Sequence, residues 1–350
     1  MRRAIATAAL ALAALGGVSA TVASPVLAAD TELCRFDASV LPEISGLAYS
    51  AVHGNVVWAH NDSGGDARLY ALDTRTCEVL AELRVRGVDA RDPEALAAGV
   101  DARGNPVLWW GDIGDNTARR DRVTIYAVPE PETLVDATVR ATAYPVRLPS
   151  RGDAEALIAD GDRLWIIGKG LISGAVWELP HPLPPDRVAR ARSIGTEDGL
   201  VTDAAMRPGG GYAVRDYSEV RIYSGSPIGE LIARRPLPEQ VQGEAMTWTP
   251  DGAALIVASE GDDRLLLVGI DEAAVPDPTP VPSTSIGPTP PASDQAQAIA
   301  SPAPSVAMPL QRVDRVGSLA VTALAVGAAV FLCSIVIVIA IARIRSRRPR

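Results

Sequence analysis

The sequence lacks the motifs that several enzyme classes require. It contains no Gly-x-Ser-x-Gly elbow, no glycine-rich phosphate loop and no His-Glu-x-x-His motif, so nothing in it supports the enzymes built on those motifs. Histidine occurs only at His53, His60 and His181. His60 has Ser63 close by, but that spacing is too local for a base and nucleophile pair. Helical periodicity is also missing between residues 30 and 274, where no apolar i, i+3, i+4, i+7 pattern lasts more than a turn or two.

Positive charge is scarce in the part of the chain that we expect to be exported. Residues 30–311 carry 24 lysines and arginines against 41 aspartates and glutamates, a net charge of −17. Such a balance argues against a basic groove and therefore against nucleic acid as a partner. It favours metal cations or cationic ligands. Lys169 is the single lysine of the chain.

Cysteine is equally scarce. Cys333 falls in a predicted membrane span, while Cys34 and Cys77 fall in the exported part. An even pair in an oxidising compartment predicts one disulfide. The alternative is two unpaired, buried thiols.

The ends of the chain carry targeting and anchoring signals. Residues 1–28 have an arginine pair, an apolar run and a small-residue exit, which predicts a secretory signal peptide. Residues 275–311 are rich in proline, serine, threonine and alanine, which predicts an extended stalk after a domain at 30–274. Residues 316–342 are apolar, free of charge and long enough to cross a bilayer once.

The orientation of the anchor follows from the basic tail. Five arginines occur within residues 343–350, and positive charge stays on the cytoplasmic side. We therefore expect a single-pass protein of the cell membrane, with its N-terminal domain outside and its C-terminus in the cytoplasm.

A short word recurs through the middle of the chain and organises it. Asp92-Pro93-Glu94-Ala95-Leu96-Ala97 has four further variants, and the position held by Glu94 is spaced by 49, 61, 48 and 41 residues. Repeats at about 40–50 residues are typical of β-propellers, in which each repeat forms one small sheet. The recurring position, which we call the anchor position, is held by Ser45, Glu94, Glu155, Asp203 and Glu244.

The repeats predict an all-β, five-bladed propeller. The fifth repeat reaches the stalk without a fourth strand, and residues 31–40 form a spare strand before the first repeat. Pairing these two closes the ring and removes exposed sheet edges. The second repeat is the longest, with its fourth strand expected at 138–148. A sixth blade hidden in that repeat, or an open sandwich, are the competing architectures.

The anchor position also suggests a ligand site. First strands line the channel of a propeller, so Glu94, Glu155, Asp203 and Glu244 should converge there. Four carboxylates around one axis repel one another unless cations, protons or arginines offset them, and calcium is a cation that takes several such oxygens. The alternative is that each carboxylate accepts hydrogen bonds from backbone N–H groups and has only a structural role.

Charged residues also follow the second strand of each repeat. Lys169 and Arg215 are candidates for holding an anion, while Asp62, Asp112 and Glu260 are candidates for holding a cation. The alternative is a set of solvated turns, which is what charged turn residues usually form.

The segment Gly111-Asp112-Ile113-Gly114-Asp115-Asn116 is the densest local signal. Carboxylate and amide oxygens on a glycine-kinked loop are the ligand types of calcium loops, although the spacing is not that of an EF-hand. Asp62, in the corresponding turn of the first repeat, together with Asp112, Asp115 and Asn116, forms the predicted calcium site.

Four short sequence motifs resemble those of secreted or surface-anchored bacterial β-propellers. They are residues 44–48 (ISGLA), 60–64 (HNDSG), 111–116 (GDIGDN) and 125–131 (IYAVPEP). More remotely they resemble the phytase-like and SdiA-regulated propeller families. The resemblance covers residues 40–131 well and the remainder only through the repeat. It implies a propeller in the cell envelope. It does not imply phytase activity, because the phosphate cleft of that family uses several lysines and this chain has one.

These observations favour a binding or scaffolding module at the outer face of the membrane, assisted by calcium, with an extracellular ligand or envelope protein as its partner. The alternative is a metal-dependent hydrolase of phosphate esters or lactones with its active site in the central channel.

Overall fold

The computed structural model describes residues 30–62 and 67–270 and is all-β in that range. The chain divides into two compact units, Met1–Pro282 and Ser283–Arg350, and every described residue belongs to the first. The predicted signal peptide, stalk, membrane span and basic tail lie outside the described residues. Within residues 30–62 and 67–270 no helix is long and apolar enough to span a membrane.

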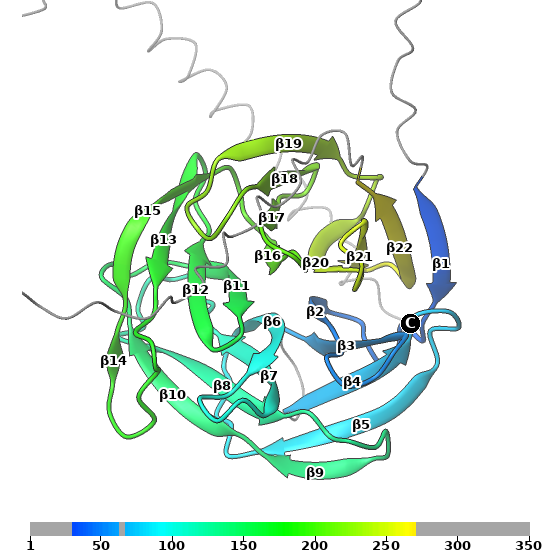
Figure 1. Ribbon diagram of the computed structural model, residues 1–350, viewed down its shortest axis with the longest axis horizontal. Coiled ribbons are helices and arrows are strands. Elements are labelled where there is room, and N and C mark those ends of the chain that lie inside the picture. The colour runs from blue at the N-terminus through cyan, green and yellow to red at the C-terminus, as the bar shows by residue number, and fades with distance from the viewer. Residues whose placement is uncertain (1–29, 63–66, 271–350) are drawn as a thin grey trace, which may run out of the picture. The chain divides into compact units, whose positions relative to one another are not determined.

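Five sheets surround a central axis and form a five-bladed β-propeller, as the repeat predicts (Figure 1). Blade one contains β2 (Ile44–Tyr49), β3 (Val56–Asn61), β4 (Arg68–Asp73) and β5 (Val79–Arg86). Blade two contains β6 (Pro93–Val100), β7 (Pro106–Asp112), β8 (Val123–Pro129) and β10 (Thr142–Arg147). Blade three contains β11 (Ala154–Asp160), β12 (Arg163–Gly168), β13 (Ser173–Glu178) and β15 (Arg192–Asp198).

The remaining two blades complete the ring. Blade four contains β16 (Asp203–Met206), β17 (Tyr212–Arg215), β18 (Glu219–Tyr223) and β19 (Leu231–Pro236). Blade five contains β20 (Gln242–Trp248), β21 (Ala254–Glu260) and β22 (Arg264–Gly269), with β1 (Thr31–Arg35) as its outer strand.

The N-terminal strand closes the ring, as expected from the incomplete fifth repeat. β1 runs antiparallel to β22, with Thr31 opposite Leu267 and Arg35 opposite Arg264. Cys34 of this strand forms a disulfide with Cys77 in the turn after β4, with an S–S distance of 2.06 Å. The outer strand of blade five is therefore bonded covalently to blade one.

The single strand expected at 138–148 is instead two strands in two different blades. β9 (Ala137–Arg140) runs parallel to β5 and adds a fifth strand to blade one, and only β10 belongs to blade two. Similarly, β14 (Ala189–Arg190) pairs with β10 of blade two before β15 enters blade three. Segments of repeats two and three thus extend the outer edges of blades one and two.

Apolar side chains fill the space between neighbouring blades. The second strands β3, β7 and β12 are buried almost throughout, because blades pack against both of their faces and leave no face for water. Trp58, Trp109 and Trp165 are among the largest fully buried side chains. These three tryptophans are therefore core residues.

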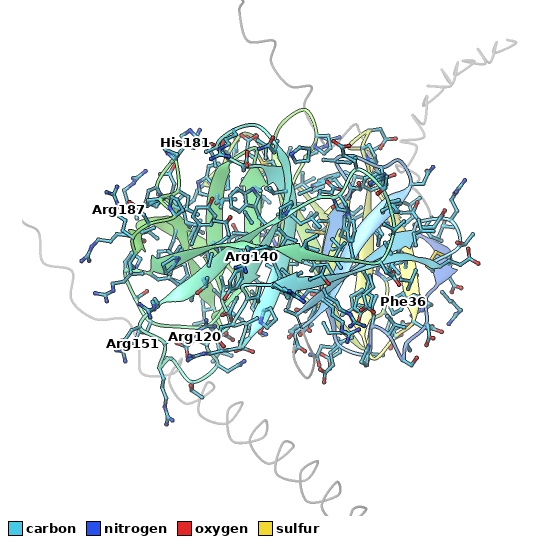
Figure 2. All side chains as sticks on the ribbon, turned by 90° about the horizontal axis from the view of Figure 1, so that it is seen from below. Phe36, Arg120, Arg140, Arg151, His181 and Arg187 are labelled. Carbon is cyan, nitrogen blue, oxygen red and sulfur yellow. A yellow bond between two sulfur atoms is a disulfide. The ribbon has the colours of Figure 1, made fainter. Side chains whose placement is uncertain are left out.

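The ring has two distinct faces. All five first strands begin at one face, which we call the mouth face, and Arg120 and Arg151 lie on it, whereas His181 lies on the opposite face (Figure 2). The strand register places both ends of the described domain, Asp30 and Ile270, at that opposite face, which we call the exit face.

Candidate functional site

A β-bulge sets the anchor residue apart in four of the five blades. The register of the first two strands shifts at Ser45, Glu94, Glu155 and Glu244, so that each is an extra, unpaired residue of its strand. Bulges re-aim side chains and are frequent beside active sites. All four residues are buried at the mouth of the channel. In blade four the ladder is regular, and Asp203 lies directly opposite Arg215.

Glu94 lies at the centre of the acidic side of this mouth. Ser45 Oγ donates a hydrogen bond to Glu94 Oε2 over 3.1 Å. Burial, followed by the charges of Glu155, Asp92 and Asp62, raises the pKa of Glu94 to about 9. Glu94 is therefore protonated at neutral pH unless a cation takes the place of its proton.

Glu155 holds the anchor position of blade three, and its partner is Lys169, the single lysine of the chain. Lys169 Nζ lies 2.9 Å from Glu155 Oε1 and 5.8 Å from the ring centroid of Tyr217. Burial raises the pKa of Glu155 to about 8 in spite of Lys169, with Asp153 adding to the rise. Burial alone would lower the pKa of Lys169, but Glu155 outweighs it and the pKa of Lys169 is raised.

Glu244 forms a second carboxylate pair with Glu260. Gln242 Nε2 donates to Glu244 Oε1 over 2.8 Å and to Glu260 Oε2 over 2.5 Å. Partial burial, then the charge of Glu244, raises the pKa of Glu260. The structure therefore places the predicted residues Glu94, Glu155, Lys169, Glu244 and Glu260 around one opening.

Asp203 and Arg215 have a different role in this structure. Arg215 is 0% exposed, and it donates to Ala245 O over 3.0 Å and to Gln240 Oε1 over 3.0 Å. Asp203 accepts hydrogen bonds from the backbone N–H groups of Ala204 and Met246, over 2.8 and 2.6 Å. Both residues join blade four to blade five. Arg215 has no surface to offer a ligand, so the anion-binding role that the sequence suggested for it does not fit its position.

The 111–116 loop is held together by its own acidic residues. Both oxygens of Asp112 face Arg120, over 2.8 and 2.7 Å, and Asp112 Oδ1 also accepts from the backbone N–H groups of Arg91 and Asp92. Asp115 accepts from the N–H groups of Arg119 and Arg120, each over 2.8 Å.

The other candidates for the calcium site contribute less to a cluster. Asn116 is exposed at the tip of the loop, and Asp62 acts on Glu94 through its charge. Among residues 30–62 and 67–270, no group of three or more histidines, cysteines or acidic residues is arranged to hold a metal ion. Calcium at Asp62, Asp112, Asp115 and Asn116 remains a prediction.

Two further acidic residues of the mouth, Asp92 and Asp153, are not among the predicted site residues. Asp92 and Asp153 each precede a glutamate at the anchor position by two residues. Asp153 Oδ1 accepts from Asp115 N over 2.8 Å. A Cβ on Gly114 would lie 2.5 Å from Asp92 Oδ2 and 2.7 Å from Glu94 Oε1, so only glycine lets the loop approach the two carboxylates so closely. The shared Asp-x-Glu spacing of repeats two and three is the signal that could have identified them.

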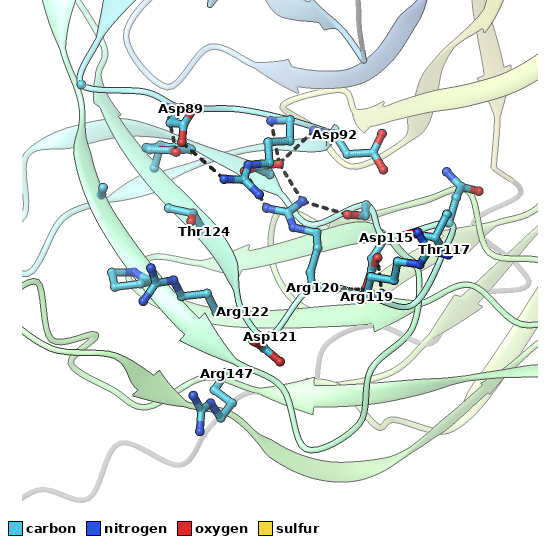
Figure 3. Close-up of a pocket in the computed structure, with 18 residues that line it drawn as sticks. Asp89, Asp92, Asp115, Thr117, Arg119, Arg120, Asp121, Arg122, Thr124 and Arg147 are labelled. Carbon is cyan, nitrogen blue, oxygen red and sulfur yellow. Dashed lines mark hydrogen bonds and ion pairs between the residues drawn. The ribbon is translucent and has the colours of Figure 1, made fainter.

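A cavity of about 1050 Å³ adjoins the acidic mouth beside blade two (Figure 3). Asp92 and Gly114 form part of its wall, so the cavity and the mouth share residues. Its lining includes arginines that were not predicted as site residues. The ionisable lining residues are Asp89, Arg91, Asp92, Asp112, Asp115, Arg119, Arg120, Asp121, Arg122 and Arg147. The cavity is therefore lined by both guanidinium and carboxylate groups, some of them paired, as Arg120 is with Asp112.

His60, which had little support as a general base, is buried between blades one and two. Its ring lies edge-on to Trp110, with 5.6 Å between centroids. Burial lowers the pKa of His60 to about 4. His60 is therefore a neutral packing residue near neutral pH.

Comparisons with known proteins give distant structural similarity only. No protein-family model matches the chain, and no curated protein matches it in sequence. A gluconolactonase from Xanthomonas campestris is similar in structure at 13% identity and a TM-score of 0.40, over 69% of this chain and 89% of that chain. A PQQ-bound aldose sugar dehydrogenase from Streptomyces coelicolor is similar at 11% identity and a TM-score of 0.42, over 69% of this chain and 98% of that chain. Similarity this distant carries no argument about the activity of the chain.

Proposed function

We propose that the chain is a membrane-anchored surface propeller that binds a cationic ligand at the acidic mouth of its central channel. The observation that carries this proposal is a carboxylate cluster in which the buried Glu94 and Glu155 lie beside the half-buried Asp92 and Asp153. Burial is the main cause of the raised pKa values of both glutamates, and neighbouring carboxylates raise them further, so the cluster would gain from more positive charge than Lys169 provides. A bound cation would supply it.

The position of the mouth supports a role in binding. The described domain begins at Asp30 and ends at Ile270 on the exit face, and the stalk predicted at 275–311 begins five positions after Ile270 in sequence. A propeller tethered through that end would present its mouth face away from the tether. The carboxylates would then meet ligands that arrive from outside the cell.

Calcium is the first ion to test, because it takes several oxygen ligands in flexible geometry. An ion that binds only the folded state stabilises it by about 2.7 kcal/mol at a hundred times its dissociation constant. We expect millimolar calcium at constant ionic strength to raise the melting temperature of the full chain. The shift should shrink in Glu94→Gln and persist in Glu132→Gln, an exposed acid outside the mouth.

The informative quantity is the difference in calcium response, because Glu94→Gln also removes repulsion without any ion. An equal shift in both variants would place the ion elsewhere. If neither calcium nor methylammonium shifts the melting temperature, the acidic mouth is structural and the proposal fails.

The anchor is tested separately. Protease added to intact cells should cut within 275–311 and release a soluble propeller. Cleavage that requires permeabilised membranes would reverse the proposed orientation.

Hydrolysis is the second candidate, and one observation favours it. The cavity of about 1050 Å³ reaches Asp92, beside Glu94, whose pKa of about 9 makes it a proton donor near neutral pH. Turnover of a lactone or phosphate ester, with and without divalent cations, would support this candidate if Glu94→Gln abolished it. The same turnover in Glu94→Gln would exclude Glu94 as the acid.

A further inference from the structure

Large apolar side chains are exposed around the acidic mouth. Leu171 is 88% exposed and Ile172 is 85% exposed, at the tip of the hairpin between β12 and β13. Val241, just before β20, is 74% exposed, and Tyr217, in the turn after β17, is 38% exposed. All four belong to loops of the mouth face, and the first three exceed every other exposed large hydrophobic residue within 30–62 and 67–270. We call these four residues the apolar rim.

The hairpin tip is held in place by its backbone. Gly199 N donates to Ile172 O over 2.7 Å, which ties the tip to the end of β15. Gly170, next to Leu171, has no space for a side chain, since a Cβ there would overlap Ser173 O. Leu171 and Ile172 are therefore presented by a tight turn, and little conformational entropy is lost when a partner covers them.

The rim is adjacent to the charged groups of the mouth. Lys169, two residues before Leu171, bonds to Glu155 and lies under the ring of Tyr217. Val241 precedes Gln242, which donates to both Glu244 and Glu260. Apolar surface and carboxylates thus alternate around the opening over blades three to five.

We infer that the apolar rim is a docking surface for a polypeptide segment that carries a basic side chain next to apolar ones. Charge complementarity with the carboxylates selects the lysine or arginine, and the rim covers the apolar neighbours. A negatively charged lipid surface is disfavoured by the same carboxylates. The inference rests on the proposed function and names the class of ligand that the mouth accepts.

The test is a selection from a phage-displayed library of random twelve-residue peptides on the full chain held in lipid nanodiscs. The enriched peptides should carry lysine or arginine beside leucine, isoleucine or an aromatic residue. Their affinity should fall by at least about tenfold in Leu171→Ser/Ile172→Ser, because two exposed side chains lose their burial in the complex. Val135→Ser is the matched control, since Val135 is 57% exposed in the loop after β8, away from the mouth.

Each other outcome overturns the inference. Enrichment that is unchanged by the double variant, or an absence of enrichment, removes the apolar rim as a docking surface. Peptides without a basic residue would contradict the chosen partner. Binding of empty anionic vesicles that the double variant abolishes would assign the rim to lipid, and self-association that it abolishes would assign the rim to a second copy.

The proposed function has a separate readout. Calcium or methylammonium could raise the melting temperature in a way that depends on Glu94, while peptide binding is unaffected by Leu171→Ser/Ile172→Ser. That result would support cation binding at the acidic mouth and exclude the apolar rim as a docking surface. If cations do not change the melting temperature but peptide binding still depends on Leu171 and Ile172, the apolar rim is supported and cation binding at the acidic mouth is excluded.

Discussion

The same position of the repeat has opposite roles on the two sides of the channel. In blade four Asp203 accepts two backbone N–H groups, one of them from Met246 in blade five, and Arg215 beside it is buried and hydrogen-bonded. In blade two Glu94 accepts a hydrogen bond from Ser45 and otherwise faces acidic residues. Asp203 is thus a structural link between blades, whereas Glu94 is a carboxylate held in place without a compensating charge.

The difference has a local cause. Blade four keeps a regular ladder at Asp203, so the carboxylate stays within reach of the next strand. Blade two has a bulge at Glu94, which turns the longer side chain towards the channel. The recurring carboxylates therefore differ in how many protein donors reach their oxygens.

The largest expected effect is at Arg215. Arg215→Met removes the donors that reach Ala245 O and Gln240 and should destabilise the domain by about 3 kcal/mol, as removal of a buried, bonded charge does. Chemical denaturation measures the loss. Arg234→Met, in which an exposed ion pair with Glu219 is lost, is the control and should cost less than about 1 kcal/mol. Equal losses in the two variants would show that Arg215 is not a link between blades.

The next effect is at Asp203. Asp203→Ala leaves the buried N–H of Met246 without its acceptor, which should cost about 2 kcal/mol. Ser45→Ala is the comparable change in blade one. We expect a smaller loss of stability, because Ser45 is the donor in both of its bonds to Glu94 and its removal leaves no backbone N–H without an acceptor. Denaturant midpoints that fall by the same amount in both variants would remove the distinction between the two sides.

An effect of opposite sign is expected at Glu94. Because its folded-state pKa is raised to about 9, burial of Glu94 costs no stability below about pH 4.5 and lowers stability as pH rises from there towards 9. Glu94→Gln should therefore raise the melting temperature at pH 8 and leave it unchanged at pH 4. A gain that does not depend on pH would mean that Glu94 is not protonated on folding.

The sequence predicted the five-bladed architecture because the number of repeats and the strand missing from the last repeat determine how a propeller closes. The spacing of the anchor position gave five blades, and the missing fourth strand of the fifth repeat gave the pairing of β1 with β22. The segment at 138–148 was misjudged as one strand. Its alternating pattern is the same for a strand that stays in blade two and for one that adds to blade one, and only the position of β5 decides between them.

The candidate site was predictable in its residue types and not in its roles. The repeat alone determined that Glu94, Glu155, Asp203 and Glu244 occupy equivalent strand positions. Only the tertiary structure decided that Asp203 and Arg215 bond to blade five, that Asp112 pairs with Arg120, and that Glu94 has few donors. The physical reason is that strand position depends on local pattern, whereas the charge state and availability of a carboxylate depend on the donors that other blades bring within about 3 Å of it.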